Sequence, residues 1–84
     1  MRVKINIKYN FKDNYYHLEV KDENDVLIPY VTSRVYENEF EADIAAGIIK
    51  MMYAKVENRK EVDSNEVDFS IRAVFRLIDA PGKW

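Results

Sequence analysis

The segment from Asn38 to Asn58 constrains the fold most, because it is the only part of the chain with a sustained helical pattern. Asn38 is a favourable N-cap residue, and Glu41 three positions later matches the acidic end of a capping box. At about 100° per residue, one apolar stripe falls on a single face, which we expect to pack on the core. The stripe consists of Phe40, Ile44, Ile48 and Met51, with Gly47 beside it, where we expect a sheet to approach closely.

A second apolar seam follows the flank of the same helix. An ordinary surface helix has an apolar stripe a little over about 100° wide, and this helix is apolar over more of its circumference. The flank therefore either lies under another layer of the chain, for which residues 27–36 and Trp84 are the candidates, or contacts a partner. We predict a protein interface here, partly exposed in the isolated chain, at Ala42, Ala46, Ile49 and Tyr53.

The segments before this helix alternate between apolar and polar residues, which predicts half-buried strands. Residues 2–11 and 15–20 form a hairpin around a turn at Lys12–Asn14, because Asp and Asn tolerate turn conformations. Residues 26–36 are rich in β-branched and aromatic residues, although Pro29 favours an edge position or a bulge.

The segment after the helix, residues 66–78, also alternates and is expected to be a long final strand that pairs with the first one. Its outward side includes the less expected Val74 and Ile78, and its inward side is Val67, Phe69, Ile71, Ala73, Phe75 and Leu77. We therefore predict an α+β fold in the order β-β-β-α-β, with one helix packed on a four-stranded, mostly antiparallel sheet in two layers. Residues 1–84 form one domain, with 79–84 as a C-terminal tail.

The composition argues against most kinds of chemistry. The chain has no cysteine and a single histidine, His17, so a thiolate zinc site is impossible and a catalytic triad is not indicated. No glycine-rich phosphate loop is possible with two glycines. We expect no enzyme activity, no cofactor, no metal and no small-molecule substrate. The sequence shows neither a signal peptide nor a membrane span, so we expect a cytoplasmic protein.

Basic residues mark a second candidate surface. If the first and last strands are neighbours, one open sheet face carries Arg2, Lys4, Lys8, Arg72 and Arg76. Positive charge beside aromatic rings suits single-stranded nucleic acid, which needs partners for phosphates and for stacked bases. The opposing observation is an isoelectric point near 5.4, well below that of a typical nucleic-acid-binding domain.

Three functions stay open on these observations. The first is a non-catalytic protein-binding module that docks on a protein partner or forms a homodimer. Heavy use of Ile, Lys, Asn, Tyr and Phe indicates an AT-rich genome. A phage- or mobile-element-encoded inhibitor of a host factor, in the anti-CRISPR-like category, fits that origin. The alternative is a small domain that binds single-stranded nucleic acid through the basic sheet face, and the third is a homo-oligomeric structural protein.

Overall fold

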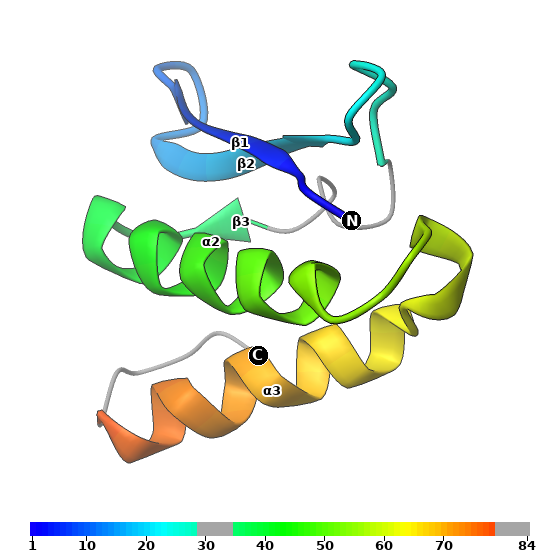
Figure 1. The fold of residues 1–84 in the computed structure, drawn as a ribbon. Coiled ribbons are helices and arrows are strands. Elements are labelled where there is room, and N and C mark those ends of the chain that lie inside the picture. Colours follow the sequence, from blue (N-terminus) through cyan, green and yellow to red (C-terminus); the bar gives the residue numbers. More distant parts are fainter. Residues whose placement is uncertain (29–34, 79–84) are drawn as a thin grey trace.

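The chain folds as a stack of three layers, a sheet, a helix and a second helix (Figure 1). The structure is a computed structural model that describes residues 1–28 and 35–78. The elements are β1 (Lys4–Asn10), β2 (Tyr15–Lys21), β3 (Val35–Tyr36), α2 (Glu39–Ala54), the 3₁₀ turn η1 (Arg59–Glu61) and α3 (Ser64–Leu77). The α+β class predicted from the sequence is confirmed, with a three-stranded antiparallel sheet in the order β1-β2-β3.

The hairpin of β1 and β2 matches the predicted alternation. Ile5 lies opposite Val20 and Ile7 opposite Leu18 on the side that faces α2. The turn closes with Asn14 at a φ of 59°, a left-handed conformation that Asn tolerates better than most residues. The apolar alternation therefore sets both the register and the buried face of this hairpin.

The predicted third strand is described only in part. Of the segment 26–36, the described residues include a bridge from Leu27 to Lys21 and the two-residue β3, which pairs with β2. Residues 29–34, including Pro29, lie outside the described residues, as does the predicted tail 79–84.

The prediction of a fourth strand is wrong, because residues 64–77 form the helix α3. Val67, Ile71 and Phe75 are buried, and their spacing of four fits one face of a helix as well as one side of a strand. Half-buried Val74 flanks this line, which explains an apolar residue that a strand would have turned outward. Asp63 caps the helix by accepting a hydrogen bond from the Asn65 backbone at 2.8 Å.

Helix α2 lies between the sheet and α3, so it is buried on two sides (Figure 1). Its start agrees with the prediction, since Asn38 accepts a hydrogen bond from the Glu41 backbone at 2.8 Å. The predicted core face is only partly right. Ile48 is buried, but Phe40 and Met51 are 58% and 55% exposed. The physical reason is that the sheet and α3 pack on α2 from two sides, so its buried residues include Ala42, Ile49 and Tyr53 on the flank as well as Ile48.

The prediction that Gly47 marks a close approach to the sheet is wrong. It is exposed, and a Cβ at this position would meet no atom within 4 Å. The core that results combines both helices with the hairpin, and its buried residues include Leu18, Val20, Ile28, Tyr36, Ala42, Ala45, Ile48, Ile49, Tyr53, Val67, Ile71 and Phe75.

Candidate protein-binding groove

The predicted interface residues lie in the core. Ala42, Ile49 and Tyr53 are fully buried and Ala46 is half-buried, so the expected exposure of this flank is wrong for three of the four. The wide apolar arc of α2 is covered by other layers of the same chain, which is one of the two alternatives that the sequence left open. The described layers that pack on α2 are the sheet on one side and α3 on the other (Figure 1), and the sequence pattern had assigned α3 to the sheet.

The basic residues predicted to share one surface are divided between two layers. Lys4 and Lys8 are exposed on β1, and Arg2 precedes that strand. Arg72 and Arg76 are exposed on α3, which α2 separates from the sheet (Figure 1). The expectation of one face formed by all five is wrong, because it required α3 to be a strand beside β1.

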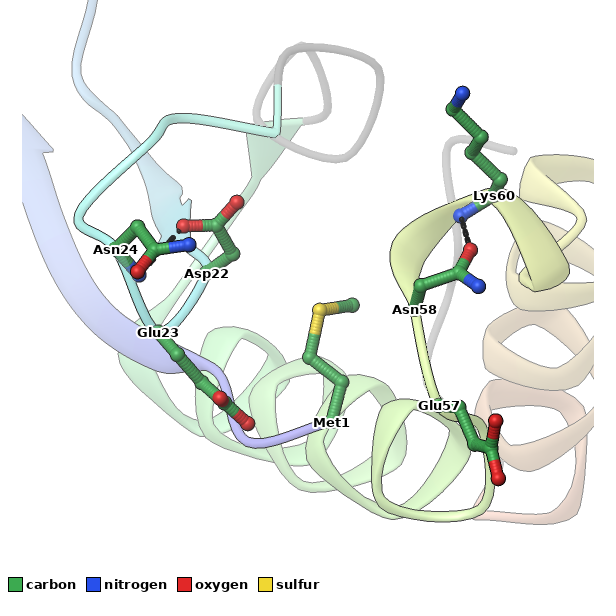
Figure 2. A pocket seen from close by; sticks show the side chains of 7 residues that line it. All are labelled: Met1, Asp22, Glu23, Asn24, Glu57, Asn58 and Lys60. Atoms are coloured by element: carbon green, nitrogen blue, oxygen red, sulfur yellow. Dashed lines mark hydrogen bonds between the residues drawn. The ribbon is translucent and has the colours of Figure 1, made fainter.

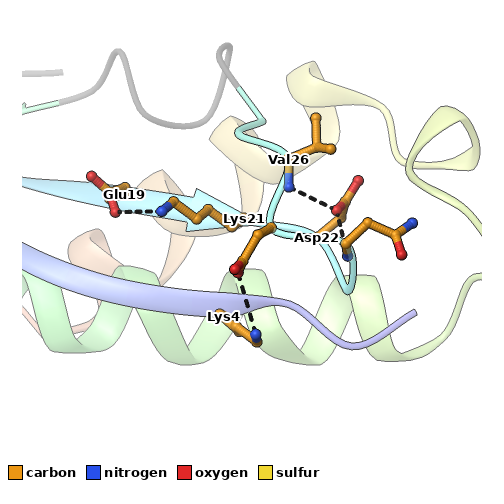
Figure 3. Close-up of polar contacts among 7 residues, drawn as sticks. Lys4, Glu19, Lys21, Asp22 and Val26 are labelled. Atoms are coloured by element: carbon orange, nitrogen blue, oxygen red, sulfur yellow. Dashed lines mark hydrogen bonds and ion pairs between the residues drawn. The ribbon is translucent and has the colours of Figure 1, made fainter.

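The outer face of the sheet keeps part of that basic character. Cross-strand pairs set Lys4 opposite Lys21 and Lys8 opposite His17. Two ion pairs offset the charge, because Lys4 lies 3.2 Å from Asp25 and Lys21 lies 3.5 Å from Glu19 (Figure 3). Lys8 is exposed on this face and lies directly opposite His17, which is not an acid.

A groove of about 360 Å³ opens between α2 and α3, near the turn that joins them. Its apolar lining comes mainly from α2 and includes an exposed methionine, while its polar lining comes mainly from the connecting segment and the start of α3. The residues that line it are Ile48, Met51, Met52, Lys55, Val56, Glu61, Val62, Glu66 and Ser70. Apolar residues make up five of these nine, and they provide most of the exposed lining.

Local interactions give this groove a defined shape. Glu61 accepts hydrogen bonds from the Glu57 backbone at 3.1 Å and from the Asn58 side chain at 3.2 Å, which organises the connection between the helices. The Asp63 cap then fixes the point at which α3 begins. Two carboxylates, Glu61 and Glu66, and one ammonium, that of Lys55, border the apolar floor.

A larger hollow of about 470 Å³ lies on the other side of the connecting segment, and six of its seven lining residues are polar. Figure 2 shows Asp22, Glu23 and Asn24 on one side, the segment with Glu57, Asn58 and Lys60 on the other, and Met1 between them. The Met1 ammonium donates hydrogen bonds to the carbonyls of Tyr53, at 3.0 Å, and of Val56. These contacts bring a positive charge to the C-terminal end of α2, where the helix dipole favours it.

The acidic groups of this hollow serve the turn that carries them. Asp22 accepts hydrogen bonds from the backbones of Asn24, at 2.8 Å, and Val26, at 3.0 Å (Figure 3). Within residues 1–28 and 35–78, no three His, Cys, Asp or Glu side chains are grouped so that they could hold a metal ion. The arrangement is that of a structured turn, and the groove between the helices is the better candidate for binding.

Comparison with protein-family models, with curated proteins and with solved structures finds no match to this chain. In the described part of the chain, no helix is both long and apolar enough to cross a lipid bilayer.

The groove residues were largely missed by the sequence analysis. Met51 was predicted on the core face, and Glu66 and Ser70 were predicted in a strand formed by residues 66–78. One pattern could have revealed the groove, because Asp63 followed three positions later by Glu66 is typical of a helix N-terminus. A second helix at that point would have predicted a seam between two helices.

Proposed function

We propose that the chain is a non-catalytic protein-binding module that receives an apolar segment of a partner protein in the groove between α2 and α3. The observation that carries the proposal is Met51, a large apolar side chain 55% exposed at the edge of a groove whose floor is also apolar. Methionine is unbranched and polarizable, and it is common on surfaces that bind apolar partners. The exposed part of the Met51 side chain would contribute to the free energy of binding when a partner covers it.

The groove also favours a particular kind of partner. Binding between two helices suits an amphipathic helix, whose apolar face lies in the groove while its polar face stays in water. Glu61 and Glu66 outnumber Lys55 at the border, so a basic residue flanking the apolar anchor gains an attractive charge contact. The partner of best fit is therefore an amphipathic segment with an apolar anchor and at least one flanking Lys or Arg.

The biological setting that we propose is inhibition of a host factor by a product of a phage or mobile element, acting in the cytoplasm. Support comes from the composition typical of an AT-rich genome and from the groove itself. In this setting the module acts by occupying a surface of its target. It needs no cofactor and no turnover.

A display library of amphipathic helical peptides tests the groove directly. Peptides selected on the folded chain should carry an apolar anchor beside Lys or Arg, and they should lose most of their affinity for Met51→Lys. The matched control is Lys50→Ala, because Lys50 is the exposed neighbour of Met51 and does not line the groove. Equal binding of the peptides to both variants would remove the groove from consideration.

Single-stranded nucleic acid remains the second candidate, now restricted to the sheet. It is supported by the cross-strand neighbours Lys8 and His17 on the outer face, with Tyr15 in edge contact with His17 at a ring distance of 6.2 Å. Affinity for mixed oligonucleotides should fall steeply with salt and should be lost in Lys8→Glu. Absence of any binding in low salt would reject this candidate and leave the groove unaffected.

A further inference from the structure

The outward ridge of α3 carries an exposed aromatic ring that the groove does not explain, although one end of the ridge, Glu66, also borders the groove. The buried line of α3 is Val67, Ile71 and Phe75, and the side opposite to it carries Phe69, which is 73% exposed. Phe69 does not line the groove. Its neighbours on the ridge, at the spacing of three and four residues that places side chains on one helix face, are Glu66, Ala73 and Arg76.

The charges of the ridge have one local explanation. An acid near the start of a helix and a base near its end complement the helix dipole, and Glu66 and Arg76 occupy these places. The dipole does not account for a phenylalanine exposed between them. Nor does either charge have an ion-pair partner in the part of the chain that the structure describes.

We propose that the ridge binds a second copy of the chain, with the two α3 helices antiparallel about a two-fold axis. The axis passes midway between Phe69 and Ala73, so each Phe69 packs over the small Ala73 of the partner subunit. Glu66 and Arg76 each lie three residues outside this pair. The same axis therefore sets Glu66 of each copy opposite Arg76 of the other.

The spacing of the ridge matches the geometry of an antiparallel helix pair. Successive separations of three, four and three residues keep Glu66, Phe69, Ala73 and Arg76 on one seam, as in the alternating core positions of a coiled coil. A large residue facing a small one lets the two backbones approach, and opposite charges at both ends specify the antiparallel direction. A closed two-fold contact of this kind uses the same patch on both copies.

The flank of the seam is compatible with this pairing. Arg72 lies beside the axis, where it approaches the Arg72 of the partner subunit. Asp68 lies four residues before Arg72, the spacing at which an acid and a base on one helix attract each other. The negative charge of Asp68 moderates the repulsion between the two arginines.

The size of the ridge predicts weak association. Helix α3 has 14 residues, which corresponds to about 21 Å of length. Stable dimers commonly bury roughly 1,200–2,000 Å² in total, and one short helix per copy provides less than that. We therefore expect a monomer–dimer equilibrium that becomes visible only at high protein concentration, and a dimer that leaves the far side of the molecule free.

Sedimentation velocity over a concentration series tests this pairing through charge exchange. Glu66→Lys and Arg76→Glu should each weaken self-association about tenfold or more, because each replaces two attractive pairs by two repulsive ones. An equimolar mixture of the two variants should associate again, since both cross pairs in the mixed dimer are then attractive. Lys8→Glu, the same kind of charge change on the sheet, is the matched control and should behave as wild type.

Two further variants separate this inference from the proposed groove. Phe69→Ser should abolish self-association while circular dichroism reports an unchanged fold, because Phe69 is exposed. Met51→Lys should leave self-association intact. A wild-type chain that stays monomeric at every concentration, or single-charge variants that fail to associate when mixed, would overturn the two-fold pairing without touching the groove.

Discussion

Replacing Phe75 by alanine tests whether residues 64–77 pack on α2 as a helix. The Phe75 ring is 1% exposed and meets the ring of Tyr36 edge-on, with centroids 6.3 Å apart. Removing a buried phenylalanine costs about 3–5 kcal/mol, because apolar contacts are lost and a cavity remains. Small domains have roughly 5–15 kcal/mol of stability in total, so the loss is a large part of it.

Phe69→Ala is the matched control for this experiment. Phe69 is the same residue type on the same helix, but its side chain is exposed. Its removal should change the free energy of unfolding by roughly 0.5 kcal/mol or less at a protein concentration too low for association. The contrast is informative because Phe69 and Phe75 are six residues apart: a strand would place both on one side, and a helix places them on different faces.

Guanidinium and thermal denaturation followed by circular dichroism provide the measurement. About 1 kcal/mol moves the melting temperature of a domain of this size by roughly 4–8 °C, so Phe75→Ala should lower it by at least about 12 °C. Similar losses from the two substitutions would show that both rings are buried on the same side. The helical assignment of this segment, and with it the ridge and the groove, would then be wrong.

Three further substitutions, at Ile49, at Gly47 and at the N-cap Asn38, test α2, each by the midpoint of chemical denaturation. Ile49→Lys should unfold the domain, because Ile49 is fully buried and a charged side chain there would lose its water. Lys50→Ala is the control and should have little effect, because Lys50 is exposed. A folded Ile49→Lys protein would refute the burial of Ile49. Gly47→Ala should stabilise the domain by roughly 0.5–1 kcal/mol, because alanine favours helix and its Cβ meets no neighbour, and a loss of stability would reveal a hidden close contact. Asn38→Ala should cost about 1 kcal/mol through the lost hydrogen bond to the Glu41 backbone, while an unchanged midpoint would mean that the cap contributes nothing.

Local patterns of the sequence were sufficient for the hairpin and for the first helix. Period-two alternation placed Leu18 and Val20 on the buried side, and the turn residues between the strands set the register. Asn38 predicted the start of α2, because its side chain can accept a hydrogen bond from the backbone of the first helical turn. These features depend on residues close in sequence, which is why they could be predicted.

The nature of the last segment could not be decided by periodicity alone. Val67, Ile71 and Phe75 are spaced four residues apart. This spacing places them on one side of a strand and also on one face of a helix, so the pattern alone does not distinguish the two. Packing on α2 resolves the ambiguity, because a helix brings those three residues together and leaves Phe69 outside. The groove then follows from the second helix, and no single stretch of sequence contains it.

The sequence by itself determined an α+β domain with an N-terminal hairpin, a capped helix and a surplus of apolar surface on that helix. Only the tertiary structure decided what covers the surplus. Because α2 lies between the sheet and α3, Ile49 and Tyr53 are core, while Met51 and Phe69 are among the apolar side chains left to water. Burial depends on how the layers of a fold pack together. The pattern along one helix indicates how much apolar surface must be covered, but it does not indicate which other element covers it.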